Sequence, residues 1–134
     1  MMLLTVELAE RLVALPALQV EDVAAWPPLA DAPLPHASLA AALGLRSDVP
    51  SRCLLVLRDG AGRRVGFCVP GMPRAVEASA DDVSRLPALL RRLRAPEWLR
   101  GFVELDRTLA LLVDLPLLAR DALQPLAAQP DRSA

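Results

Sequence analysis

Thirteen prolines and six glycines are spread along this chain of 134 residues, and they limit its regular elements more than any other feature. Proline removes a backbone donor and breaks the interior of a helix, and both residue types mark turns. The segments between them are roughly 5–12 residues long, a length that suits short strands and one-turn helices. A bundle of long helices is therefore excluded, and the sequence predicts an all-β domain with short helices.

The N-terminal segment predicts a β-hairpin followed by a turn of helix. Polar residues interrupt the apolar stretch Leu3–Leu8, and a second apolar run, Arg11–Leu15, follows a turn expected at Ala9–Glu10. Ala17–Trp26 has the spacing of a short helix that passes into a strand. The prolines directly after Trp26 predict a connection that cannot lie inside a sheet.

Two short helices are marked by capping residues. Ser38 precedes a run rich in leucine and alanine that ends at Gly44, so a hydroxyl cap begins the helix and glycine closes it. Asp114 caps a terminal helix that we expect from Leu115 to about Leu123. The same order of strand, cap and helix recurs at Leu34–Leu43 and Leu111–Leu118. This recurrence indicates either two related half-barrels or only the abundance of leucine.

Two further hairpins are predicted in the second half of the chain. The clearer signal is Asp59-Gly60-Ala61-Gly62, which lies between the apolar runs Cys53–Leu57 and Arg64–Val69. Trp98–Glu104 and Thr108–Val113 flank three residues of turn type and predict the last hairpin.

The register of the first of these hairpins decides which residues face the core. If Arg58 pairs with Arg63, alternate residues of the two strands share one face of the sheet. That register predicts a core face formed by Leu54, Val56, Val65 and Phe67. It also places Cys53 opposite Cys68, so a disulfide is geometrically conceivable, although two buried thiols are the expectation for a cytoplasmic chain.

Between the last two hairpins the sequence predicts only short pieces. Val76 closes a short strand, and Ala80–Val83 has the composition of a helical turn. Leu86–Arg94 contains a proline and is expected to form a loop or a short helix. Its arginines, Arg91, Arg92 and Arg94, either face an acidic partner or lie in a solvated loop.

Length and composition indicate a single domain, which we expect at residues 1–127, followed by a flexible tail at residues 128–134. The chain is 54% apolar, and fifteen basic against sixteen acidic residues give a net charge of −1. No basic excess is available for nucleic acid or for an anionic membrane. Glu7 and Glu10 interrupt the N-terminal apolar run too early for a signal peptide. We therefore expect a cytoplasmic protein without membrane insertion.

Few residues are suited to catalysis or to binding a metal. A zinc site needs about four cysteine or histidine ligands at short spacings, and only Cys53, Cys68 and His36 are available, scattered along the chain. His36 has no acid and hydroxyl partners at a catalytic spacing, and Gly60-Ala61-Gly62 lacks the strand–loop–helix context of a phosphate site. We expect no enzymatic activity, no metal and no cofactor.

Several blocks of the sequence resemble the CheW-like family, the small adaptor domains of bacterial chemotaxis arrays. The blocks that carry the resemblance are Cys53–Leu57, Gly62–Gly71, Trp98–Asp106 and Leu111–Leu115. Upstream, Glu10–Pro16, Val20–Val23 and Leu34–Leu45 resemble the first hairpin of the family, the turn after it and the first step from strand to helix. The resemblance implies a CheW-like pair of small SH3-like β-barrels that share an apolar seam.

The resemblance also implies partners and a binding site. Family members bind the cytoplasmic tip of a methyl-accepting chemoreceptor and the regulatory domain of a CheA-type histidine kinase. The positions that match the receptor groove are Val20, Asp22, Val23, Val65 and Gly66. An apolar trough with a close backbone approach at glycine, and one acid to fix the register, would suit an amphipathic helix. The valines are equally suited to the core, and Gly66 to a kink in a strand.

One departure from the family pattern affects the expected function. Between Pro28 and Leu34 the chain has only five residues, where family members carry a longer segment that includes a strand. We therefore expect an incomplete second barrel and a receptor-binding adaptor whose coupling to the kinase is weakened or lost. Two alternatives stay open, namely a full receptor–kinase scaffold and a homo-oligomeric module in which the free strand edge pairs with another copy or another CheW-like protein.

Overall fold

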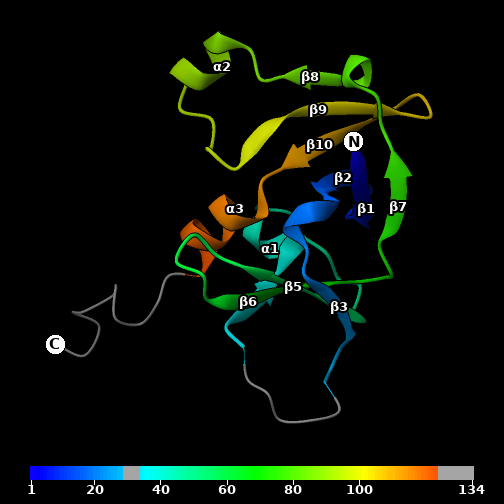
Figure 1. Cartoon of the computed structure of the whole chain (residues 1–134), viewed down its shortest axis with the longest axis vertical. Helices are drawn as coiled ribbons and strands as arrows, with labels where there is room; N and C mark the ends of the chain where they lie inside the picture. The colour runs from blue at the N-terminus through cyan, green and yellow to red at the C-terminus, as the bar shows by residue number, and fades with distance from the viewer. Residues whose placement is uncertain (29–33, 124–134) are drawn as a thin grey trace, which may run out of the picture.

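The computed structural model describes residues 1–28 and 34–123 and consists mainly of strands (Figure 1). The strands are β1 (Met2–Leu8), β2 (Arg11–Pro16), β3 (Asp22–Ala25), β4 (His36–Ser38), β5 (Cys53–Arg58), β6 (Arg64–Val69), β7 (Arg74–Glu77), β8 (Val83–Arg85), β9 (Leu99–Leu105) and β10 (Thr108–Val113). The helices are α1 (Leu39–Ala42), α2 (Ala88–Arg92) and α3 (Leu115–Ala122), with 3₁₀ turns η1 (Ala17–Gln19) and η2 (Ala80–Asp82). The predicted all-β class with short helices is confirmed.

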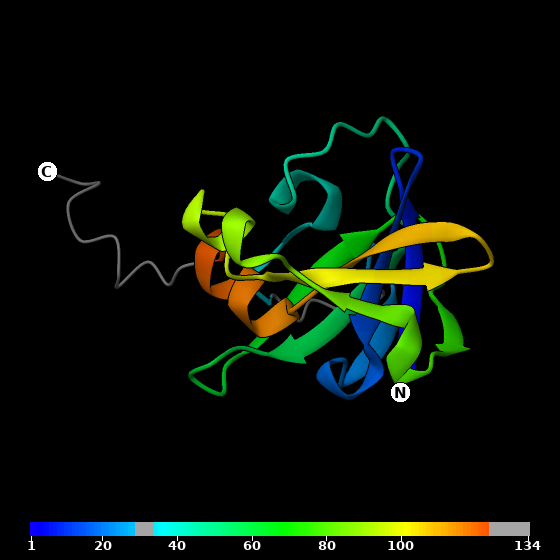
Figure 2. The same ribbon diagram turned by 90° about the horizontal axis from the view of Figure 1, so that it is seen from above.

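The strands form two sheets. One has six strands in the order β7-β1-β2-β10-β9-β8, and the other has four in the order β3-β5-β6-β4. The larger sheet is strongly twisted, since Figure 2 shows β9 crossing over β1 at a steep angle. The smaller sheet has two edge strands, β3 and β4, among the described residues. Its few strands agree with the expectation of an incomplete second barrel.

Both sheets and two helices share one apolar core. Phe67, the largest fully buried side chain, lies there with Leu15 of the larger sheet, Leu39 of α1 and Leu118 of α3. Figure 1 shows α1 and α3 beside the junction of the two sheets. Full burial of one such side chain contributes about 1.5–3 kcal/mol, so this seam holds the halves of the molecule together.

The predicted recurrence of strand, cap and helix is present in both halves of the fold. In one half β4 runs parallel to β6 and leads into α1, where Ala41 N donates to Ser38 Oγ at 3.3 Å. In the other half β10 runs parallel to β2 and leads into α3, where Leu117 N donates to Asp114 Oδ1 at 3.2 Å. This agreement favours related half-barrels over a coincidence of composition.

The register predicted for the β5–β6 hairpin is wrong by one residue. Arg58 pairs with Arg64 rather than with Arg63, because Asp59 and Arg63 continue the ladder and the loop contains only residues 60–62. Gly62 has a φ of +80°, which closes such a three-residue loop. The residues of the hairpin that face the shared core are therefore Cys53, Leu55, Leu57, Val65, Phe67 and Val69. Leu54 and Val56, predicted to lie with them, pack on the opposite face with Cys68.

The remaining expectations for the fold have mixed outcomes. The first and last hairpins are confirmed as β1–β2 and β9–β10. Ala80–Val83 is helical only to Asp82, and Val83 begins the short edge strand β8 against β9. The strand at Val76 extends to Glu77.

The expected tail at residues 128–134 lies outside the described residues. Within the described part, no helix has the length and apolarity needed to cross a membrane.

Candidate protein-interaction surface

A group of charged side chains lies where β3 begins and the β5–β6 hairpin closes. Glu21 Oε2 is 3.0 Å from Arg58 Nε, and Glu21 Oε1 is 3.3 Å from Arg64 Nε. The backbone amide of Glu21 also donates to the carbonyl oxygen of Val56 at 2.7 Å. These side chains are between 40% and 56% exposed, so each ion pair contributes only about 0–1 kcal/mol to stability. Their main effect is to fix a pattern of alternating charge on the surface.

Asp22 extends this pattern along the edge strand β3. Its side chain is exposed, and Asp22 Oδ1 accepts a hydrogen bond from the backbone amide of Val23 at 2.8 Å. The carboxylate thus engages an amide of an edge strand that a foreign strand would otherwise use for pairing. We call Glu21, Asp22, Arg58 and Arg64 together the β3 surface.

The pairing of the four-stranded sheet brings two of the predicted site residues into one row. Asp22 pairs with Val56, Val56 pairs with Gly66, and Gly66 pairs with His36. Asp22 and Gly66 are therefore two strands apart, a separation of roughly 10 Å. Val65 precedes Gly66 in β6 and faces the opposite side of the sheet, as the alternation predicts.

The three valines of the predicted site belong wholly or partly to the shared core. Val65 has 0% exposure, so its side chain offers no surface to a partner. Val20 and Val23 are partly buried and pack against the same core. The expectation that the valines could be core residues is thus met fully at Val65 and in part at Val20 and Val23.

Gly66 is buried rather than open to a partner helix. A Cβ atom built at Gly66 would lie 2.6 Å from Leu54 Cδ1 and 3.0 Å from Leu54 Cγ. Leu54 belongs to a second apolar cluster, where Trp26 and Leu34 pack against it. The side chain of Leu54 occupies the space above Gly66, so a partner backbone could approach this glycine closely only if Leu54 moved. A contact between this part of the sheet and a receptor stays a prediction.

Comparison with known proteins decides the family. Residues 29–123 match the family model described as the CheW-like domain, which is more than half of the chain. The chain belongs to the CheW-like domain family. The crystal structure of the scaffolding protein TtCheW from Thermoanaerobacter tengcongensis has the same fold, with a TM-score of 0.70 and 14% identity over 87% of this chain and 86% of that one. No curated protein matches the chain in sequence.

In this CheW-like domain the turn beside the β3 surface is held by the partly buried carboxylate of Asp59. Asp59 Oδ1 accepts from the backbone amides of Ala61 and Arg63, each at 2.9 Å, and Asp59 Oδ2 accepts from Arg63 Nε at 3.2 Å. These bonds, first of all the one from the amide of Arg63, lower the pKa of Asp59. Arg63 Nη2 also donates to the carbonyl oxygen of Leu123 at 2.7 Å, which ties the turn to the end of α3.

The side chains of the two cysteines and of the histidine pack against other residues of the CheW-like domain. Cys53 lies opposite Val69, and Cys68 lies opposite Leu54, so the two thiols point to opposite faces of the sheet. Both are free and buried, which confirms the expected thiols and rules out the disulfide geometry, and burial raises the pKa of Cys68. The ring of His36 lies against Trp26, with centroids 4.6 Å apart. Residues 1–28 and 34–123 contain no group of three or more ligands suited to a metal.

Sequence reasoning missed three of the four residues of the β3 surface. Arg58 and Arg64 pair directly across the hairpin, and like charges in that position are destabilising unless an opposite charge lies between them. Glu21 supplies that charge. A correct three-residue loop would have placed the two arginines side by side and would have pointed to an acid on the neighbouring strand.

Proposed function

We propose that this CheW-like protein is a non-enzymatic, cytoplasmic chemosensory adaptor whose β3 surface binds the cytoplasmic signalling tip of a chemoreceptor. Membership of the family supports the role of adaptor. One observation carries the assignment of the surface. Asp22, the acid that resembles the groove residue of the family, follows Glu21, which pairs with Arg58 and Arg64, and lies opposite Val56 in the sheet, two residues before Arg58. Alternating charges of this kind fix the register of a polar helix more than they add affinity.

The other predicted site residues would act mainly from beneath this surface. Val65 and Gly66 set the position of β6, while Val20 and Val23 connect β3 to the core. A receptor helix on the β3 surface would touch Asp22 and the exposed parts of Val20 and Val23. It would reach Gly66 only if Leu54 moved.

The small four-stranded sheet supports a second part of the proposal, which is weak coupling to a CheA-type histidine kinase. The described part of this sheet ends at β3 and β4, and only a short segment of the chain separates them. An absent strand removes a surface on which a partner domain could pack. The shortened chain resembles FrzB, a CheW-like protein of the myxobacterial Frz pathway, and this closer resemblance is part of the proposal.

Titration of two partner fragments tests the proposal and separates it from its alternatives. We expect a chemoreceptor tip fragment to bind, and the regulatory domain of the kinase to bind at least tenfold more weakly than it binds a paralogue with a longer second barrel, a gap of about 1.4 kcal/mol. Equal kinase affinity in both proteins would favour the full receptor–kinase scaffold. A stable homo-oligomer that binds neither fragment would favour the assembly module.

A further inference from the structure

One end of the molecule carries a concentration of positive charge that the proposed function does not use. Residues 83–100 contain five of the fifteen arginines and only one acid, Glu97, although the whole chain has a net charge of −1. These residues form β8, α2 and the beginning of β9, which lie in Figure 1 at the end of the molecule opposite β3, β5 and β6. The charge is therefore localised and separate from the β3 surface.

The single acid of this segment does not neutralise its arginines. Glu97 Oε2 lies 3.0 Å from Arg120 Nη2, so the carboxylate is engaged by a cation of α3. Arg85, Arg92, Arg94 and Arg100 are exposed, and within residues 1–28 and 34–123 none of them forms an ion pair with a carboxylate. An anionic partner would meet these guanidinium groups without displacing an internal ion pair.

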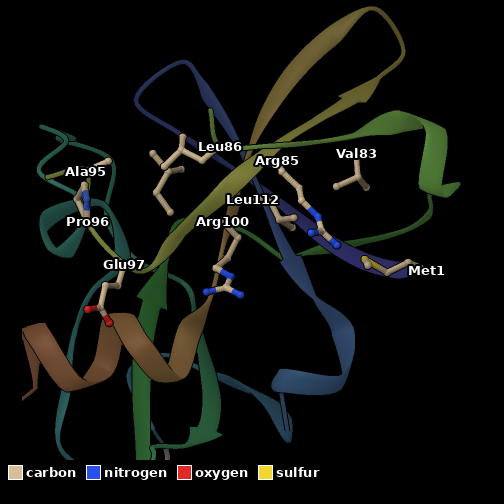
Figure 3. Close-up of a pocket in the computed structure, with 10 residues that line it drawn as sticks. Met1, Val83, Arg85, Leu86, Ala95, Pro96, Glu97, Arg100 and Leu112 are labelled. Carbon is tan, nitrogen blue, oxygen red and sulfur yellow. The ribbon is translucent and has the colours of Figure 1, made fainter. Parts of the chain in front are cut away.

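A hollow of about 650 Å³ lies in the middle of this charged end (Figure 3). Its lining is largely apolar and includes Val83, Leu86, Leu99 and Leu112. Three charged side chains also line it, namely Arg85 of β8, Arg100 of β9 and Glu97, whose carboxylate is the one paired with Arg120. Next to it, on and just after α2, Leu89 is 65% exposed and Leu93 is 69% exposed. The hollow thus combines an apolar floor with a cationic rim.

We infer that this hollow is a docking site for an acidic, amphipathic segment of another protein. Apolar side chains of such a segment would enter the hollow, which residues of β8, β9 and β10 line together. Its carboxylates would pair with Arg85 and Arg100, whose planar guanidinium groups suit two-pronged contacts with carboxylates. Complementary charge at the rim would raise the association rate and select against basic segments. A nucleic acid has no apolar side chains to fill the floor. A flat lipid surface would contact the leucines of α2 and leave the concave floor empty.

A model peptide tests the inference with the full-length protein. The probe is a fluorescein-labelled amphipathic helix of about five turns, with leucines on one face and glutamates on both flanks. We expect fluorescence anisotropy to report binding with a Kd in the micromolar range, weakened at least tenfold in the double variant Arg85→Glu/Arg100→Glu. The matched control is Arg11→Glu/Arg46→Glu, which makes the same change of charge at exposed arginines outside the hollow and should alter the Kd by less than about twofold.

Two altered peptides and one lipid control complete the test. Replacement of the glutamates by glutamine, or of the leucines by serine, should each weaken binding at least tenfold. The inference is overturned if the original peptide does not bind, if the control variant loses as much affinity as the double variant, or if either altered peptide binds as well as the original. It is also overturned if the protein does not bind the peptide but sediments with vesicles of phosphatidylcholine and phosphatidylserine in equal parts. The charged end would then be a membrane-binding surface.

Discussion

Replacement of Gly66 by alanine should destabilise the protein, because the added methyl group has no free space. The Cβ atom would lie 2.6 Å from Leu54 Cδ1, 3.0 Å from Cγ and 3.3 Å from Cδ2, so the whole end of that side chain must move. Leu54 is only 6% exposed and packs in the cluster with Val56 and Cys68, which restricts its movement. Gly60 is a matched control, since a Cβ atom at this position meets nothing within 4 Å.

The expected magnitude follows from two opposing effects. Insertion of a methyl group into a filled apolar cluster costs about 1–3 kcal/mol. Loss of conformational freedom in the unfolded chain returns about 0.4–1 kcal/mol when glycine becomes alanine. Gly66→Ala should therefore lower the free energy of unfolding by about 1–2 kcal/mol, whereas Gly60→Ala should leave it unchanged or raise it slightly.

Urea unfolding followed by circular dichroism measures both variants, and a shift of the midpoint by roughly 0.5–1 M is expected for Gly66→Ala. The same change made in a Leu54→Ala background should cost almost nothing, which would give a coupling energy of at least about 1 kcal/mol between the two positions. If Gly66→Ala is as stable as Gly60→Ala, the space above Gly66 is open. A receptor helix could then contact Gly66 directly, without movement of Leu54.

Three further predictions concern residues near the same sheet. Val65→Asp should lower the free energy of unfolding by several kcal/mol, measured by urea unfolding, because it places an unpaired charge at a site with 0% exposure. Asp59→Ala should cost about 1–2 kcal/mol at neutral pH. Because the pKa of Asp59 is lowered in the folded protein, the difference from the wild type should be full above the usual aspartate pKa of 3.8 and should shrink as the pH falls through the lower folded pKa, since the neutral carboxyl still accepts the backbone hydrogen bonds more weakly. Cys53 and Cys68 should react with a thiol reagent only after unfolding, and rapid reaction in the native protein would contradict their burial.

Local signals in the sequence were sufficient for most elements of the fold. The caps at Ser38 and Asp114 begin helices as predicted. The first and last hairpins form although their turns contain no glycine. The turn residues Ala9, Glu10, Asp106 and Arg107 all adopt a positive φ, a conformation that usually favours glycine. Runs of apolar residues on either side of short turns were enough to locate these strands, although the last turn contains two residues and not the three expected. The short strand β8 was missed because it is an edge strand of three residues that forms only against β9.

The β5–β6 hairpin marks the limit of such reasoning. Its existence was clear from the sequence, but a difference of one residue in loop length reverses the faces of the strands. Every residue of both strands except the terminal arginines is buried, so the usual alternation of apolar and polar residues could not fix the register. The space occupied by Leu54 above Gly66, and the ion pairs of Glu21, depend on that register and could not be predicted without it.

Binding of a chemoreceptor tip fragment to Asp22→Arg tests the central proposal most directly. Asp22 is exposed, so the variant should keep the stability of the wild type, and Asp48→Arg makes the same change of charge at an exposed loop residue away from the β3 surface. Isothermal titration calorimetry should show that the wild type and Asp48→Arg bind the fragment with similar Kd, while Asp22→Arg binds at least tenfold more weakly, a loss of about 1.4 kcal/mol or more. Equal affinity of the two variants, or no binding by the wild type, would contradict the assignment of the β3 surface to the receptor.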